Sequence, residues 1–327
     1  MKIGYALSSE EHAPSELVRC ASRAEEVGFD FAMISDHFHP WIDRQGESSF
    51  VWSVIGAIAA STERIEVVTG VTCPLIRIHP AIVAQAAATV SDMMPGRFSL
   101  GLGTGENLNE HVVGEGWPPA GQRLSMLEEA VAVIRDLFSG ENVNHDGPWF
   151  AVENAKLYTM PDDPPPILMA AAGQRAAKLA GGAGDGLIST SPQAEIVDAF
   201  RAAGGDGKPA YAQVTLCWAT SEAEARRTAR EVWPNAGLQG ELTQELPLPR
   251  HFEQAVEPLS EDKVAESVVC GPDPKPVLES IRTYQDAGFD HIYLHQVGPD
   301  QDGFFGFFES ELMSQLEAHD RARGSPI

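Results

Sequence analysis

Cysteine is scarce in this chain of 327 residues, and its four cysteines are far apart: Cys20, Cys73, Cys217 and Cys270. None of them belongs to a CxxC pair, which argues against a disulfide framework and against a zinc site. So few unpaired cysteines fit a reducing compartment, and we expect a cytoplasmic protein with no structural metal.

Long apolar runs are missing as well. No segment approaches the roughly 18–20 apolar residues of a membrane span, and the first residues, MKIGYALSSEEHAP, lack the apolar core of a signal peptide. Positive charge is also in short supply: 23 Lys and Arg against 47 Asp and Glu give a formal net charge of −24. Such a chain should repel nucleic acid and anionic membranes, so we expect neither as a partner and look for a small-molecule ligand instead.

Short apolar runs alternate with helical patterns about eight times along the chain. This alternation predicts parallel strands joined by crossover helices, and about eight units favour a closed (β/α)8 TIM barrel over an open sheet. We expect one domain over residues 1–327, with insertions at about 103–124, 139–166 (a hairpin and linker) and 234–262, where residues 234–258 read as irregular. The expected strands are 2–7, 29–34, 65–71, 98–102, 167–171, 186–189, 211–218 and 291–295, and the last expected helix is 307–316.

Reactive side chains follow the second predicted strand, in the sequence SDHFHPW. The active site of a barrel lies where the carboxyl ends of its strands meet. There, His37 can take or give a proton near neutral pH, and Trp41 offers a flat face for a ligand. The alternative is a surface turn with Asp36 as a cap and Trp41 packed against the protein.

Glycines and acids follow other strands. The pair in Gly103-Thr104-Gly105-Glu106 would let a flat group approach the backbone, although the spacings GxGxxG and GxxxxGKS are absent. A tight turn capped by Asn107 or Asn109 is the alternative. The Ala172-Gly173-Gln174 segment opens a helix and is a plausible anion site.

Two glutamates complete the candidate chemistry. If Glu10 and Glu106 share an apolar cavity with His37, we expect one of them to shift toward its protonated form. An acid and a base so placed are what hydride transfer from an alcohol needs.

Four segments together resemble the F420-dependent branch of the luciferase-like (bacterial luciferase superfamily) oxidoreductases, and most closely its F420-dependent glucose-6-phosphate dehydrogenase group. They are SDHFHPW, GTGENLNE, AAAGQRAAKLAGGAGDG and AGFDHIYLHQVGPDQDGFF. The resemblance spans nearly the whole chain and implies an enzyme with a luciferase-like barrel that uses coenzyme F420.

The resemblance also implies roles for individual residues. His37 would take the proton of a substrate hydroxyl while hydride passes to C5 of the deazaflavin, and Trp41 would shield the reacting centre. Glu106 would be the acid near N1, Glu10 a second acid, and the bond between Gly70 and Val71 a cis peptide. Positions that match the cofactor site are Asp36, Gly70, Val71, Cys73, Thr104, Gly105, Asn109 and, at the cofactor phosphate, Ala172 and Gly173.

The chain departs from the family at the substrate phosphate. Sugar-phosphate members hold it with lysines at positions that match Gln193 and Glu266, while Thr190 is retained. A glutamate would repel a phosphate dianion. The resemblance therefore implies an uncharged alcohol, sugar or lactol as substrate, and glucose 6-phosphate is disfavoured.

Other functions stay open on the sequence alone. The same barrel could serve an FMN-dependent monooxygenase or an F420H2-dependent reductase acting on another acceptor, or could bind cofactor or sugar without turnover. Relatives commonly dimerise through barrel helices, and the alanine-rich faces at 55–60 and 84–90 would suit a homodimer. The alternative is that these faces pack only on their own barrel.

Overall fold

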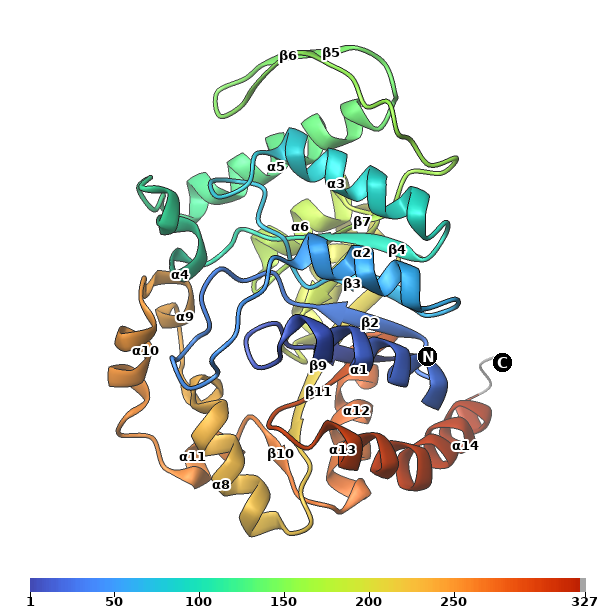
Figure 1. Ribbon diagram of the computed structural model, residues 1–327, viewed down its shortest axis with the longest axis vertical. Coiled ribbons are helices and arrows are strands. Elements are labelled where there is room, and N and C mark those ends of the chain that lie inside the picture. Colours follow the sequence, from blue (N-terminus) through green and yellow to red (C-terminus); the bar gives the residue numbers. More distant parts are fainter. Residues whose placement is uncertain (324–327) are drawn as a thin grey trace.

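Eight parallel strands form a closed barrel in the computed structural model, which describes residues 1–323 and the side chains of residues 1–318 (Figure 1). The strands are β1 (Lys2–Leu7), β2 (Phe31–Ile34), β3 (Glu66–Thr69), β4 (Phe98–Leu102), β7 (Ile167–Ala170), β8 (Gly186–Ser189), β9 (Ala210–Cys217) and β11 (His291–Gln296). They pair in the order β9-β11-β1-β2-β3-β4-β7-β8, and β8 pairs with β9 to close the ring. The predicted (β/α)8 barrel is confirmed, and each expected strand is present.

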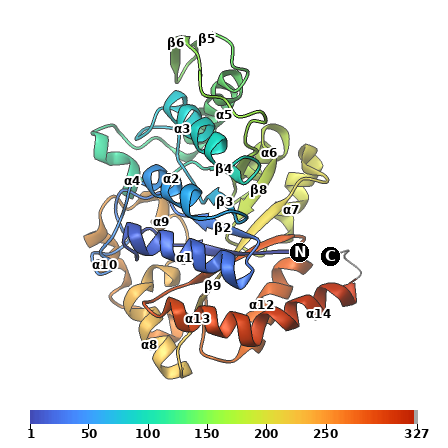
Figure 2. The same ribbon diagram turned by 45° about the vertical axis from the view of Figure 1, so that its right-hand side comes forward.

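Helices cover the outside of the barrel (Figure 2). Proline occupies the first turn of several, where its missing N–H breaks no helical hydrogen bond. Gly28 ends the first helix at a φ of 93°, a left-handed conformation that favours glycine. The helices that follow the strands are α1 (Pro14–Val27), α2 (Val51–Ser61), α3 (Pro80–Met93), α5 (Ala120–Leu137), α6 (Gln174–Ala183), α7 (Ala194–Phe200), α8 (Glu222–Val232) and α12 (Pro274–Asp286).

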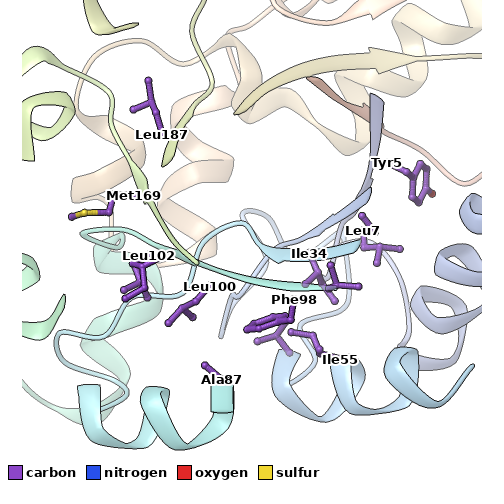
Figure 3. Close-up of a cluster of buried hydrophobic side chains, with 14 of the residues drawn as sticks. Tyr5, Leu7, Ile34, Ile55, Ala87, Phe98, Leu100, Leu102, Met169 and Leu187 are labelled. Carbon is purple, nitrogen blue, oxygen red and sulfur yellow. The ribbon is translucent and has the colours of Figure 1, made fainter. Parts of the chain in front are cut away.

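The apolar core has two parts. The larger part lies between strands and helices, where Ile55 of α2 and Ala87 of α3 lie near Phe98 and Leu100 of β4 (Figure 3). The smaller part fills the inside of the barrel with side chains that alternate with the outward ones. It consists of Phe31, Met33, Val68, Leu168, Ile188, Tyr211 and Tyr293. The barrel is thus closed by apolar side chains below its carboxyl end.

The predicted hairpin is confirmed, and the predicted irregular stretch is wrong. β5 (Val143–Asp146) and β6 (Ala151–Ala155) pair antiparallel as the expected hairpin, which projects from the barrel at the top of Figure 1. Residues 234–258 are not irregular. They form η3 (Pro234–Gly237), α9 (Leu242–Glu245) and α10 (Pro249–Val256), followed by α11 (Glu261–Ala265), and two of the prolines start helices rather than break them.

The last helical segment begins earlier than expected. α13 (Gln301–Phe307) starts after Asp300, whose side chain accepts a hydrogen bond from the Gly303 N–H, and η4 (Phe308–Leu312) and α14 (Met313–Arg323) continue it. A two-residue strand, β10 (Val269–Cys270), lies beside β9. Within the described chain, no helix has both the length and the apolar character needed to cross a bilayer.

Candidate active site

Two adjoining cavities open at the carboxyl end of the barrel. The first has a volume of about 770 Å³ and the second about 830 Å³. Residues of β9 and β11, of the segments that follow β2, β3, β4, β7 and β8, and of α9 (Leu242–Glu245) and the loop before it line both, so the cavities meet where these residues lie. The shared residues are His37, Gly70, Glu106, Ala172, Thr190, Gln213, Gly240, Gln244 and Tyr293.

His37 lies at this junction between two carboxylates. Its Nε2 is 3.2 Å from Glu10 Oε1 and 3.8 Å from Glu106 Oε2. Its Nδ1 is 3.2 Å from the carbonyl of His39, which can only accept, so Nδ1 carries the proton in the neutral ring. Nε2 is therefore the nitrogen that takes up and releases a proton, and it faces the junction of the cavities.

His37 and Glu10 shift each other's pKa in opposite directions. Burial lowers the pKa of His37, but the charges of Glu10 and Glu106 outweigh it, so the net pKa is raised. Burial raises the pKa of Glu10, but the charge of His37 and the Ser35 hydroxyl, 2.6 Å from the carboxylate, bring it below its usual value. Of the two acids, Glu10 is therefore not the one shifted toward its protonated form, because its pKa is lowered.

Asn109 joins the two sequence motifs. Its Oδ1 accepts from the N–H groups of Phe38 (2.9 Å) and His39 (3.2 Å), and its Nδ2 donates to Glu106 Oε2 at 3.0 Å. Asn109 belongs to the short helix α4 (Asn107–Glu110), which follows β4. It is therefore a tie between the loop after β2 and the loop after β4, and the alternative of a simple turn cap does not describe it.

Trp41 forms a wall of the second cavity beside His37. The two ring centroids are 5.0 Å apart, and the other side of the indole meets Phe252 of α10 edge to face at 5.2 Å. The indole thus connects the reactive loop to the helical insertion. A merely packed surface turn is excluded, because Trp41 and His37 both line a cavity and Asp36 is buried.

Asp36 is held by residues that sequence analysis missed. Thr72 Oγ1 donates to its Oδ2 at 2.7 Å, and Arg77 Nη2 lies 2.8 Å from its Oδ1. The same guanidinium is 3.5 Å from Glu110 Oε1, so one buried cation serves two buried carboxylates. The available signal was that Arg77 is the one Lys or Arg in residues 70–79, among apolar neighbours.

The first cavity has a floor of bare backbone. The Gly70–Val71 bond is cis, as the resemblance implies. A Cβ on Gly103 would lie 2.5 Å from Val71 Cγ2, and one on Gly105, at a φ of 72°, would lie 2.6 Å from Cys73 Sγ. Only glycine fits these positions, and the surface they leave suits a flat group. Asp36, Thr104 and Asn109 line the same cavity.

The first cavity also reaches the start of α6. Ala172, Gly173 and the first residues of α6 line it, and Gly173 has no side chain to cap the helix, so the first N–H groups of the helix are free to bind an anion. Arg175 and Arg123 line it too, as does Glu241, and Arg123 pairs with Glu245 at 3.3 Å. A flat floor and a helix N-terminus beside Arg175 together fit a molecule with an aromatic head and an anionic group. Among the described residues no cluster of His, Cys, Asp and Glu could hold a metal ion.

The expected substrate residues are only partly brought together. Thr190 and Glu266 line the second cavity, but Gln193 is exposed and lines neither. Glu266 is paired with Lys263 at 2.5 Å on the edge of α11. No lysine or arginine is among the residues that line the second cavity in the described chain.

The chain is similar to known proteins over nearly its whole length. Residues 1–291 match the family model of luciferase-like monooxygenases. The F420-dependent glucose-6-phosphate dehydrogenase of Nakamurella multipartita is 35% identical over 97% of each chain, and that of Mycobacterium tuberculosis is 35% identical over 97% of this chain and 98% of the relative. Among solved structures, an F420-dependent secondary alcohol dehydrogenase in complex with an F420–acetone adduct superposes with a TM-score of 0.87 and 31% identity, covering 94% of this chain and 97% of that one.

Proposed function

The chain belongs to the luciferase-like monooxygenase family and is an F420-dependent oxidoreductase, and we propose that it oxidises a hydroxyl of an uncharged alcohol, sugar or lactol with His37 as the base. The observation that carries the proposal is the place of His37 Nε2, at the junction of two cavities and 3.2 Å from an ionised Glu10.

The first cavity fits coenzyme F420 by the chemistry of its walls. Gly70, Val71, Cys73 and the backbone of Thr104 and Gly105 would hold the flat deazaflavin, with Asp36 and Asn109 at its edge. Ala172, Gly173 and Arg175 at the start of α6 would hold the phosphate. When bound, the deazaflavin supplies the hydride acceptor, at C5.

The protein contributes the proton chemistry. Neutral His37 presents the Nε2 lone pair to the second cavity, where it accepts the proton of the substrate hydroxyl. The imidazolium that forms is stabilised by Glu10, which Ser35 (2.6 Å) and Ser8 (3.1 Å) hold in place. Glu106, oriented by Asn109, is the more exposed of the two acids and would hold the proton near N1.

The charge of the second cavity supports a neutral substrate. Its described lining includes Glu10, Glu106 and Glu266 and no Lys or Arg, so a phosphate dianion would meet carboxylates without a cation in contact. Trp41 lines one side and would shield the reacting hydroxyl from water. The neutral alcohol named for the superposed structure is of this class.

The test is bleaching of the oxidised deazaflavin absorbance by uncharged alcohols and sugars. We expect His37→Ala to lower turnover by about 10²–10⁴-fold, the usual contribution of a general base. His39→Ala is the matched control. His39 is two residues from His37 and lines neither cavity, and its ring nitrogen Nδ1 is 2.9 Å from the carbonyl oxygen of Leu108. Turnover by His37→Ala at the rate of the parent would disprove the assigned base.

A further inference from the structure

The second cavity has a polar wall that the reaction at His37 does not use. Gln213 and Thr215 of β9 and His295 of β11 line it, and Thr215 is directly opposite His295 in the register of the two strands. These positions continue the alternation of Tyr211 and Tyr293, which point into the barrel. Buried parallel strands are normally apolar on both faces. Polar side chains that point into the barrel at the carboxyl ends of β9 and β11 therefore suggest a function in binding.

A hydrogen-bond chain fixes which atoms face the cavity. The amide nitrogen of Gln213 can only donate, so His295 Nδ1, which lies 3.2 Å from it, is the acceptor. In the neutral ring Nε2 then carries the proton, and it lies 3.6 Å from Glu11 Oε2. The same amide nitrogen donates to Thr215 Oγ1 at 2.9 Å. Both amide hydrogens of Gln213 are thereby used within the wall.

Buried supports hold this chain in place. Glu11 accepts the Gly298 N–H at 2.9 Å, and the indole of Trp233 meets the His295 ring edge to face at 4.5 Å. Glu11 and His295 are each about 5% exposed in their side chains, whereas Gln213 and Thr215 are partly exposed toward the cavity. Two groups of the wall therefore remain available to hydrogen-bond a ligand: the Gln213 amide oxygen, which accepts, and the Thr215 O–H, which donates.

One acceptor beside one donor is the complement of a hydroxyl group, which both donates and accepts. A carboxylate or phosphate would meet the Gln213 oxygen and the acids of the cavity, and the wall offers it no cation. We propose that Gln213 and Thr215 form a second hydroxyl-binding site, so that the substrate is a neutral diol or polyol held there by one hydroxyl while another lies at His37. This rests on the proposed function and adds a requirement to it: two hydroxyls rather than one.

A matched set of ring alcohols tests the site: cyclohexanol against the cyclohexane-1,2-, 1,3- and 1,4-diols, with F420-saturated enzyme. We expect at least one diol to exceed cyclohexanol in kcat/KM by about tenfold, and Thr215→Val to remove most of that preference, as for the loss of one neutral hydrogen bond. Thr215→Ser keeps the hydroxyl and should keep the preference. Thr283→Val, at a threonine of the same cavity whose hydroxyl donates to the Glu279 carbonyl, should leave the ratio at the parent's value.

A binding measurement separates the two proposals. Thermal stabilisation of the F420-saturated protein by the preferred diol should exceed that by cyclohexanol, and Thr215→Val should abolish the difference. Turnover of alcohols with no preference for any diol, or with a preference that Thr215→Val does not change, overturns the second site and leaves the proposed function standing. Selective binding of a diol without turnover upholds the site and rejects the function. Neither binding nor turnover rejects both.

Discussion

The Asn109 side-chain nitrogen donates to Glu106 at 3.0 Å, while its oxygen accepts from the Phe38 N–H at 2.9 Å and so joins the loop after the fourth barrel strand to the loop that carries His37. One buried amide thus sets the relative position of the two motifs on which the proposed chemistry depends. It does so because its oxygen and its nitrogen have different partners: two N–H groups on one side and a carboxylate on the other.

Because the oxygen and the nitrogen of Asn109 have different partners, we expect different outcomes for two variants of this residue. Asn109→Asp keeps an acceptor for the loop but faces Glu106 with a like charge, so we expect activity to fall about tenfold or more while the fold is kept. Asn109→Ala leaves two N–H groups unpaired and should also lower the free energy of unfolding, by about 1–3 kcal/mol. Initial rates and urea denaturation of both variants make the comparison. Equal activity of Asn109→Asp and the parent would show that Glu106 needs no such orientation.

The pH dependence of oxidation should report on His37. Its pKa is raised above 6.5 by its neighbouring carboxylates, and oxidation needs the neutral ring, so kcat/KM should rise with pH through an acid limb above pH 6.5. Glu10→Gln removes a negative charge 3.2 Å from Nε2 and so destabilises the imidazolium. The pKa of His37 then falls and the acid limb moves to lower pH. A limb that stays in place, or moves upward, would contradict the pairing; Glu16→Gln, on an exposed helix face, controls for a general change of net charge.

The barrel was predictable because its strands are short continuous apolar runs between helices, a local pattern that burial on both faces imposes. The reactive loop was predictable for a related reason: SDHFHPW and GTGENLNE directly follow two such strands, so the topology brings them together. What the sequence alone could not supply depends on contacts between distant segments. The ion pairs of Arg77 join residues 33 to 41 positions apart, and the pKa of Glu10 falls through Ser35 and His37, which no periodicity reveals.

One error in the predicted elements has a particular cause. Pro234 and Pro249 looked like breaks, but each lies in the first turn of a short helix that packs on the barrel mouth, and such helices are too short to show an apolar period. Gln193 was placed by matching a loop residue to a family position, and its role stays a prediction. The geometry of loops is set by their packing rather than by spacing from a strand, and in the structure this side chain is exposed.

The buried ion cluster of Arg77 should matter for stability far more than an exposed one. The side chains of Arg77, Asp36 and Glu110 are all less than 10% exposed, so Arg77→Met would leave two buried carboxylates without their cation. We expect a loss of about 3–5 kcal/mol in the free energy of unfolding. Arg19→Met, which breaks exposed pairs with Glu16 and Asp302, is the control and should cost about 1 kcal/mol or less.

The deficit of Arg77→Met should also depend on pH. Burial already raises the pKa of Glu110, and loss of the guanidinium raises it further. A carboxyl with a raised pKa in the folded state binds more protons there than in the unfolded chain, so its contribution is most favourable below the usual pKa of glutamate and is lost as pH rises through the folded pKa. Urea denaturation at pH 5 and pH 8 should therefore show the larger deficit at pH 8. A deficit that does not change with pH would mean that the cluster acts through packing alone.

A change of charge at one residue of the second cavity, Glu266, should shift the preference of the enzyme from a neutral toward an anionic substrate. Glu266 lines the cavity and pairs with Lys263 at 2.5 Å, so its negative charge would repel a phosphate and also neutralises a neighbouring cation. Glu266→Gln releases Lys263, and Glu266→Lys adds a second cation. We expect kcat/KM for glucose 6-phosphate relative to glucose to rise in the order parent, Glu266→Gln, Glu266→Lys, by about tenfold or more at the last step, or roughly 1.4 kcal/mol. The gain should shrink at high salt, because the pair is exposed. Glu257→Lys, an equal charge change on a residue that lines neither cavity, should leave the ratio unchanged, and an equal rise in both variants would mean that net charge rather than position governs selectivity.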